Sequence, residues 1–173
     1  MVHEAEIPVD ASSLIYIAKC DGFRVFARCV PVLIAPPAVW SEAVDAGERI
    51  AAPEVVRIRE AEAAGSLQRV DLEREQAKDA RSLSRRHGLG QGESEVLALA
   101  RAQGVCVIDE GRGTRVAKAL GIEAIPTLLV PAFGARAGMI TRRVGLAMLR
   151  CLAIVSSARA EVVFRIEEAF KGR

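Results

Sequence analysis

Short apolar segments alternate with helical patterns along the chain, and this alternation constrains the fold more than any other feature. The clearest apolar segment, residues 105–108, reads Val-Cys-Val-Ile and ends at Asp109 and Glu110. Further strands are predicted at residues 7–9, 30–35, 67–70 and 122–125. Apolar strands separated by helices are typical of a parallel sheet that is covered on both faces. The sequence therefore predicts the α/β class, as a three-layer α/β/α fold with a central, mainly parallel sheet.

Helix signals fall between the predicted strands. Ser12 or Ser13 is expected to cap the first helix, and Pro37 suits the first turn of a helix over residues 38–46. Further helices are predicted at residues 58–64, 73–86, 93–103 and 114–120, and residues 127–170 read as helices punctuated by glycines. We expect the C-terminal helical extension to cap the sheet.

The composition fits one folded domain. A length of 173 residues with 51% hydrophobic residues supplies a sizeable core. We expect a single domain over residues 1–173, with a core at about 7–138 and a helical segment at about 139–173. Only 4% of the residues are aromatic, which argues against a platform of stacked rings for single-stranded nucleic acid. The formal net charge of +2 permits a nucleic-acid partner without requiring one.

Several features predict a cytoplasmic protein. Residues 1–6 are acidic and lack the apolar region of a signal peptide. No apolar run reaches the roughly 18 to 20 residues that a membrane span requires, so no membrane partner is expected. The four cysteines form no CxxC pair and have no histidine at metal-ligand spacing, which argues against a zinc site. The mostly apolar neighbours of Cys20, Cys106 and Cys151 predict reduced packing residues.

Acidic residues follow two of the predicted strands. Asp10 comes after the first strand, and Asp109 and Glu110 come after the clearest one. In open α/β sheets, ligands bind beyond the carboxyl ends of the strands, although a carboxylate at such a position is more often a helix cap. Glu42 follows another apolar segment on a predicted helix, where a solvated helix face is the plainer interpretation when it stands alone.

Helix geometry separates Glu93 from Glu95. At about 100° per residue, Glu93 lies on the side of Val96, Leu97 and Ala100, which is the apolar face. Glu95 points nearly the opposite way. A carboxylate on a buried face is costly without a partner, so Glu93 is the better site candidate. The alternative is a first-turn residue that complements the helix dipole.

These acids share one chemical explanation. Mg²⁺ and Mn²⁺ prefer carboxylate oxygens and water, and a divalent ion removes the repulsion among converging carboxylates. Such an ion also activates water and neutralises charge on a phosphodiester under attack. The candidate catalytic and metal-binding residues are Asp10, Glu42, Glu93 and Asp109, with Glu110 as a further candidate ligand.

Four segments, in order, resemble the motifs of the PIN domain, the small metal-dependent ribonuclease fold of VapC-type toxins. They are Val9-Asp-Ala-Ser-Ser-Leu-Ile15, Trp40-Ser-Glu42, the run from Gly90 to Ala100, and Val107-Ile-Asp-Glu110 with the following arginines. The third is similar to a subfamily with Gly-Glu-x-Glu at this place. The resemblance covers about residues 7–138.

The resemblance implies an acidic cluster of Asp10, Glu42, Glu93 and Asp109 that holds Mg²⁺ or Mn²⁺ and hydrolyses RNA. It also implies the toxin of a type II toxin–antitoxin system, with a small antitoxin as partner, and a homodimer. Two choices stay open, because either Asp109 or Glu110, and either Glu93 or Glu95, can be the direct ligand. The Gly-Thr-Leu-Gly stretch common in the subfamily is here Pro-Thr-Leu-Leu, starting at Pro126.

Basic residues flank the third and fourth motifs. Arg86 lies just before the third motif, and Arg112 and Arg115 follow the fourth. We predict that these three contact RNA phosphates, the alternative being solvated helix faces. Arg112 and Arg115 are the stronger candidates because they follow the strand end directly.

Other functions find less support. The glycines at 88, 90 and 92 lack both the spacing and the preceding strand of a dinucleotide loop. The sequence contains only two histidines, which argues against Ser-His-Asp or Cys-His catalysis. A non-catalytic RNA- or protein-binding module is the main alternative, and a nucleotide-binding regulator is a third.

Overall fold

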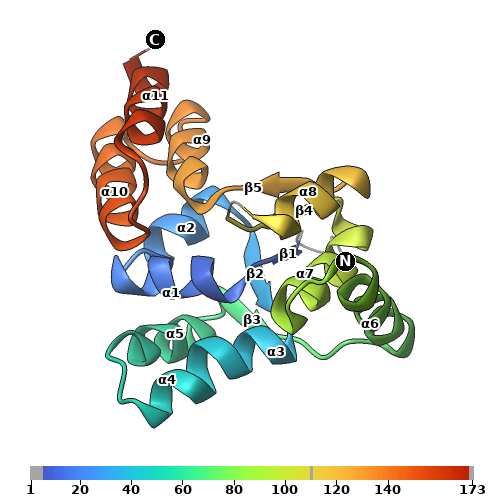
Figure 1. Cartoon of the computed structure of the whole chain (residues 1–173). Coiled ribbons are helices and arrows are strands. Elements are labelled where there is room, and N and C mark those ends of the chain that lie inside the picture. The colour runs from blue at the N-terminus through green and yellow to red at the C-terminus, as the bar shows by residue number, and fades with distance from the viewer. Residues whose placement is uncertain (1–5, 110, 172–173) are drawn as a thin grey trace, which may run out of the picture.

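A parallel sheet runs through the centre of the molecule (Figure 1). The computed structural model describes residues 6–109 and 111–171. The strands are β1 (Glu6–Pro8), β2 (Val32–Ala35), β3 (Leu67–Arg69), β4 (Val105–Val107) and β5 (Glu123–Ile125). β1, β2 and β3 pair in parallel, as do β4 and β5, and a parallel bridge from Val9 to Val107 joins β1 to β4. The strand order is therefore β3-β2-β1-β4-β5, which confirms the predicted parallel sheet.

Helices connect the strands and continue after the last one. They are α1 (Ala11–Lys19), α2 (Phe23–Cys29), α3 (Pro37–Trp40), η1 (Ser41–Asp45), α4 (Ala46–Arg49), α5 (Glu54–Ala63), α6 (Arg74–His87), α7 (Gln91–Gln103), α8 (Arg112–Ala119), η2 (Thr127–Leu129), α9 (Val130–Arg136), α10 (Arg142–Val155) and α11 (Ala160–Lys171). The predicted helices are confirmed, with boundaries that differ by a few residues. The sequence analysis missed α2, a short helix that buries Phe23 and Phe26.

Both faces of the sheet are buried, which explains the unbroken apolar sequence of β2. Leu33 joins the main core, whereas Val32 and Ile34 pack with Leu99 of α7 in a separate cluster. Since successive side chains of a strand point to opposite faces, an apolar residue is needed at every position. α6 and α7 lie to one side of the sheet in Figure 1, and α1 and α5 lie to another.

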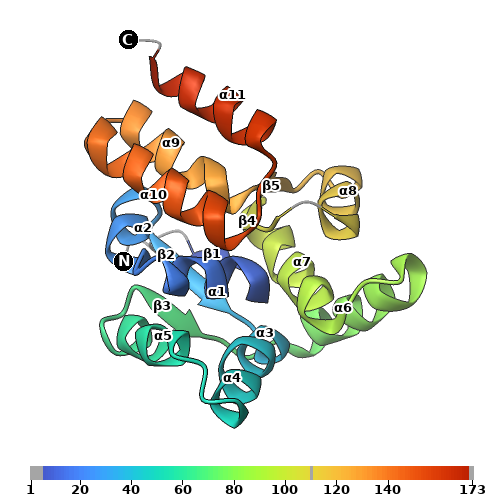
Figure 2. The ribbon, with the colours of Figure 1, turned by 60° about the vertical axis from the view of Figure 1, so that its left-hand side comes forward.

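The C-terminal helices α9, α10 and α11 stack on one another beside α1 and α2 (Figure 2). Ile166 and Phe170 of α11 pack with Ala132 and Leu149 in a small core of their own. An ion pair of 2.8 Å between Arg150 and Glu167 also joins α10 to α11. Within the described residues, no helix has the length and apolar character needed to cross a membrane.

Two of the predicted reduced cysteines are paired in the structure. Cys20, at the end of α1, forms a disulfide with Cys151 of α10, so the prediction was wrong for both residues. Their sequence separation is 131 residues, but the packing of α10 beside α1 brings their Cα atoms to 5.8 Å. Neighbouring residues in the sequence carry no information about such a pairing. Cys106 is a free, buried thiol as predicted.

Candidate acidic active site

Asp10 lies at the carboxyl end of β1, where the strand order reverses. Its backbone N–H donates to Val107 O at 3.1 Å, which places it directly beside the end of β4. Its side chain caps α1, since Oδ1 accepts from the Ser13 backbone N–H at 2.8 Å and Oδ2 accepts from the Ser12 hydroxyl at 3.1 Å. Asp10 therefore caps this helix in place of the predicted Ser12 or Ser13. A crevice at such a switch point is the usual ligand site of open α/β sheets.

Asp10 and Asp109 interact electrostatically. Asp10 is only 7% exposed. Burial raises the pKa of Asp10, hydrogen bonds from Ser13 oppose this effect, and the charge of Asp109 raises the pKa further. Both carboxylates therefore lie at the carboxyl edge of adjacent strands, as the sequence predicted, and the charge of Asp109 makes ionisation of Asp10 more costly.

Thr127 orients Asp109. The Thr127 backbone N–H donates to Asp109 Oδ1 at 2.9 Å, and its hydroxyl donates to Oδ2 at 3.1 Å. Thr127 is 1% exposed and follows β5, the next strand across the sheet. The sequence analysis missed this residue. A hydroxyl residue after a neighbouring strand is the signal that points to it, because parallel strands end at the same edge.

Glu42 reaches the site from η1, a turn of π-helix between α3 and α4. Such turns are rare and occur frequently at functional sites. The Glu42 carboxylate lies against Gly92 at the start of α7. Glu42 Oε1 would be 3.1 Å from a Cβ added to Gly92, so the glycine leaves room for the carboxylate. Glu42, which is exposed on its helix, thus lies against the first turn of α7, which also contains Glu93.

Glu93 lies between α7 and α8. Its Oε2 accepts from the Gly90 backbone N–H at 3.2 Å, and its Oε1 faces Gly113 at the start of α8. A Cβ on Gly113 would be 2.9 Å from that oxygen and 2.7 Å from Ile108 Cδ1. Glu93 is therefore close to the residue that precedes Asp109. Gly92 and Gly113 are further site residues that the sequence analysis did not single out.

Glu95 points elsewhere. It is 8% exposed, and its Oε2 accepts from the Ala38 backbone N–H at 2.8 Å, at the start of α3. Gln91 donates to Oε1 at 3.0 Å. Both oxygens are thus engaged in joining α7 to α3. Glu93 and Glu95 point to different elements, but Glu95 is the more deeply buried of the two, so the prediction that Glu93 lies on the buried face and Glu95 away from it was wrong. The reason is that α7 is buried on most sides, and α3 covers the side of Glu95.

The four candidate acids do not form one cluster of mutually contacting carboxylates. Asp10 meets Asp109, while Glu42 and Glu93 contact glycines of α7 and α8. Among the described residues, no three His, Cys, Asp or Glu side chains are grouped closely enough to hold a metal ion. The donor chemistry is nevertheless that of a hard divalent cation, since every donor is a carboxylate oxygen. Glu110, the further candidate ligand, lies outside the described residues.

The predicted RNA-binding arginines differ in their contacts. Arg112 Nη1 donates to the carbonyl oxygens of Gly88 at 2.7 Å and His87 at 3.4 Å, which ties α8 to the turn between α6 and α7. Arg86 and Arg115 are exposed on α6 and α8. Arg112 therefore fixes the turn that precedes Glu93, in addition to any contact with a ligand.

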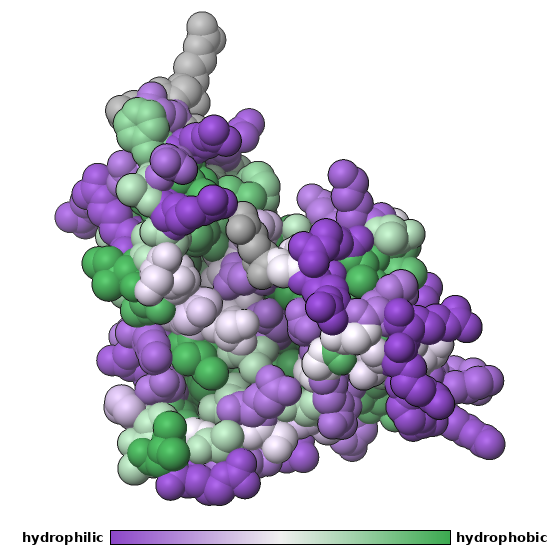
Figure 3. Space-filling model, viewed as in Figure 1, coloured by the Kyte–Doolittle hydropathy of each residue, from purple (hydrophilic) through white to green (hydrophobic). Residues whose placement is uncertain are grey.

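A cavity of about 590 Å³ adjoins Asp109, and we name it the Asp109 cavity. Asp109 and Tyr16 line it from the core, and Arg159 and Arg165 line it from the C-terminal helices. Figure 3 shows the surface hollowed between these helices and the lobe of α6, α7 and α8. The sequence analysis did not select Tyr16, Arg159 or Arg165, because only the fold brings them near Asp109.

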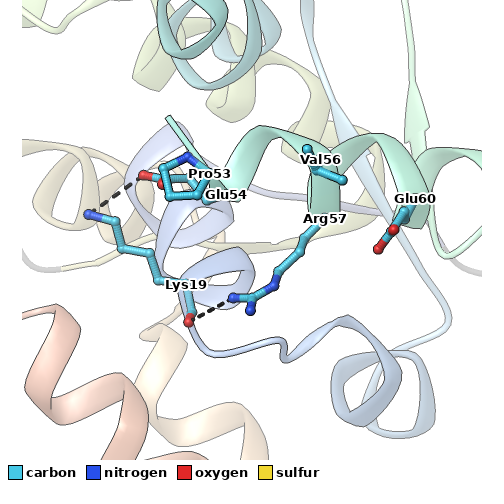
Figure 4. A pocket seen from close by; sticks show the side chains of 6 residues that line it. All are labelled: Lys19, Pro53, Glu54, Val56, Arg57 and Glu60. Atoms are coloured by element: carbon cyan, nitrogen blue, oxygen red, sulfur yellow. Dashed lines mark hydrogen bonds and ion pairs between the residues drawn. The ribbon is translucent and has the colours of Figure 1, made fainter. Parts of the chain in front are cut away.

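A second cavity, of about 430 Å³, is lined by α1 and α5 (Figure 4). Its two basic side chains, Lys19 and Arg57, are both engaged in contacts within the protein. Lys19 lies 3.7 Å from Glu54, and Arg57 donates to the carbonyl oxygens of Ala18 and Lys19 at 2.9 and 3.1 Å. None of the candidate acids lines this cavity.

Comparison with known families agrees with the geometry. A family model described as a PIN domain, DUF3368, matches residues 7–160. PIN domains are generally nucleases, and they generally use divalent metals. No match was found among curated proteins or among solved structures. The matched region contains the sheet apart from Glu6, the four candidate acids and helices α1 to α10, so the chain belongs to the PIN-domain family DUF3368.

Proposed function

We propose that this protein is a divalent-metal-dependent endoribonuclease. The observation that carries the proposal is the placement of Asp10 and Asp109 at the ends of β1 and β4, where the strand order reverses. Glu42 and Glu93 are directed toward glycines that adjoin this edge. Membership of a family of nucleases supports the same conclusion.

The chain's own residues position the acids. Ser12 and Ser13 orient Asp10, and Thr127 orients Asp109, so hydrogen bonds from the chain itself fix both carboxylates. A bound Mg²⁺ or Mn²⁺ would activate water and neutralise charge on the phosphodiester. Asp10, Asp109, Glu93 and Glu42 are the residues that we propose to hold it.

The test is cleavage of single-stranded RNA by the wild type with Mg²⁺, Mn²⁺ or EDTA. We expect divalent-dependent cleavage that Asp10→Asn and Glu93→Gln each reduce at least about 100-fold. Glu60→Gln is the matched control, because Glu60 is an exposed acid that lines the distant cavity of Figure 4. Unchanged cleavage by Asp10→Asn, or none with any divalent ion, would contradict the proposal. Metal-independent RNA binding without cleavage would favour a non-catalytic module.

We further propose that the nuclease is the toxin of a type II toxin–antitoxin pair. The resemblance of the four acidic motifs to VapC-type toxins supports this role. Induced expression in a bacterial host should stop growth with the wild type and not with Asp10→Asn. Normal growth with active wild-type enzyme would contradict the toxin role while leaving the nuclease proposal intact.

We also propose a homodimer that uses the C-terminal helices. Phe133, Ile154 and Phe164 expose 46%, 79% and 61% of their surface on α9, α10 and α11. Large apolar side chains that are exposed on neighbouring helices are candidates for a protein interface. Light scattering should give twice the monomer mass, and a strict monomer at high concentration would contradict the dimer.

A further inference from the structure

We propose that the Asp109 cavity binds the substrate strand next to the cleaved phosphodiester, with Arg159 and Arg165 contacting its phosphates. The proposal rests on the proposed ribonuclease function and extends it to residues in and next to α11. α11 runs from Ala160 to Lys171, whereas the match to the family model ends at residue 160. Arg165 therefore belongs to a part of the chain that the family does not describe.

The position of the cavity is the first argument. Asp109 forms part of its wall, so the cavity meets the candidate acidic site at this residue, whereas Asp10, Glu42 and Glu93 are not in the lining. The oxygens of Asp109 that meet Thr127 hold this wall in place. A strand whose phosphodiester lies at the acids must continue over neighbouring surface, and this cavity begins at Asp109. Its volume of about 590 Å³ falls within the range of about 300–1,000 Å³ that is usual for ligand pockets.

The charge of the cavity is the second argument. Arg159 and Arg165 are exposed, and within the described part of the chain no ion pair engages either guanidinium. Asp109 is the acid in the lining. Two guanidinium groups that form no ion pair among the described residues, next to the proposed nuclease centre, complement a phosphate backbone, since arginine recognises phosphate oxygens through a fixed fork of donors.

The arginines are presented by a well-anchored element. α11 packs through Ile166 and Phe170, and Glu167 pairs with Arg150 of α10 at 2.8 Å. The turn before Arg159 contains Ser157 in the left-handed conformation, with φ of 53°. Such a conformation is uncommon for a residue other than glycine and fixes the direction of the chain. Arg159 and Arg165 thus face the cavity from a fixed wall.

The remaining lining suits a nucleotide. Tyr16, Leu128 and Leu129 provide a partly apolar wall on which a base can stack or pack. Ser156 also lines the cavity. Phosphates and a base each find a matching group here.

The experiment measures binding of a fluorescent single-stranded RNA by anisotropy over a range of salt concentrations. All proteins carry Asp10→Asn, and a gel checks that the RNA stays intact. The test variant adds Arg159→Ala and Arg165→Ala. The matched control adds Arg142→Ala and Arg143→Ala, which remove the same charge from the opposite end of α10, about 20 Å along the helix.

We expect the test variant to raise Kd about 10-fold and to lower the salt slope by about 1.4, the value for two lost phosphate contacts on a single strand. The control should change both much less. Equal effects of the two double variants, or no binding of RNA by the parent, would overturn the proposal. A fluorescent acidic peptide serves as a second probe. If Arg159→Ala and Arg165→Ala weaken binding of this peptide but not of RNA, the proposal is overturned and the cavity is assigned to a protein partner.

A second measurement avoids substitutions in the cavity. RNA that contains 4-thiouridine is crosslinked by light to the parent protein, and mass spectrometry identifies the attached peptides. We expect crosslinks in the peptide of Tyr16 or in residues 156–166, and crosslinks confined to other peptides would contradict the proposal. If the wild type cleaves RNA but RNA binding is unchanged by the substitutions of Arg159 and Arg165, only this inference is refuted. If the wild type does not cleave RNA but RNA binding depends on these two arginines, only the nuclease function is refuted.

Discussion

Thr127 binds Asp109 through two hydrogen bonds, one from its backbone N–H and one from its hydroxyl. The two residues lie 18 positions apart and follow β4 and β5, which are adjacent in the sheet. A substitution can remove the hydrogen bond from the hydroxyl but not the one from the backbone N–H. Thr127, an uncharged residue, thus helps to orient Asp109, a candidate metal ligand.

Thr127→Val should reduce metal-dependent RNA cleavage about 10-fold and lower the free energy of unfolding by about 1 kcal/mol, because one hydrogen bond to a carboxylate is lost. Thr141→Val is the control. It removes the N-cap of α10, where Thr141 accepts from the Val144 N–H, and should cost similar stability without loss of cleavage. Equal activity losses in both variants would show that Thr127 acts through stability alone. Cleavage rates and urea denaturation give both quantities.

Glu93→Gln and Glu95→Gln should have opposite effects. Glu95 accepts from the Ala38 N–H and from Gln91 with separate oxygens, and an amide retains only one acceptor. Glu95→Gln should therefore lower the free energy of unfolding by about 1–3 kcal/mol and leave cleavage intact. Glu93→Gln should abolish cleavage at nearly unchanged stability, since an amide oxygen can still accept from Gly90. The reverse pattern would make Glu95 the direct ligand.

Gly113→Ala should impair cleavage, because a Cβ would come 2.9 Å from Glu93 Oε1 and 2.7 Å from Ile108 Cδ1. The carboxylate or the isoleucine must move. Gly104→Ala is the control, since Gly104 has a φ of +74° and open space around it. It should cost about 1 kcal/mol of stability through backbone strain without altering cleavage. Full activity of a folded Gly113→Ala protein would show that Glu93 does not need this position.

Asp10→Asn should stabilise the metal-free protein at neutral pH. The pKa of Asp10 is raised in the folded state above its ordinary value of 3.8, so the folded protein binds more protons between the two values. Wild-type stability therefore falls as the pH rises through that window. The advantage of Asp10→Asn should shrink toward pH 3.8, as measured by denaturation in EDTA. An advantage that is equal at both pH values would show that ionisation of Asp10 is not its cause.

Reduction of the Cys20–Cys151 disulfide should destabilise the protein by about 2–4 kcal/mol, because the bridge closes a loop of 131 residues. Cys151→Ser should lower the melting temperature to the same extent as a reductant does for the wild type. Cys29→Ser is the control, since Cys29 is a free cysteine. A melting temperature of the wild type that does not change with reductant would contradict the prediction.

The local sequence was sufficient for the strands and for the pairing of acids with strand ends. Residues 105–108 are apolar enough to be buried on both faces, and Asp109 follows them, so its place at the edge of the sheet could be predicted. The same reasoning placed Asp10 beside it. It did not identify Asp10 as the cap of α1, because Asp10, Ser12 and Ser13 have similar capping propensity and only the backbone geometry selects among the three.

Contacts between distant segments could not be predicted. The disulfide of Cys20 with Cys151, the hydrogen bond of Glu95 with Ala38 and the place of Arg165 beside Asp109 each join residues that share no sequence pattern. Periodicity reports which face of an element is buried, and it carries no information on which element covers that face. The sequence by itself thus determined the parallel α/β sheet and the acids at its edge. Tertiary packing alone decided which side chains surround those acids, because side-chain neighbours depend on how whole helices dock.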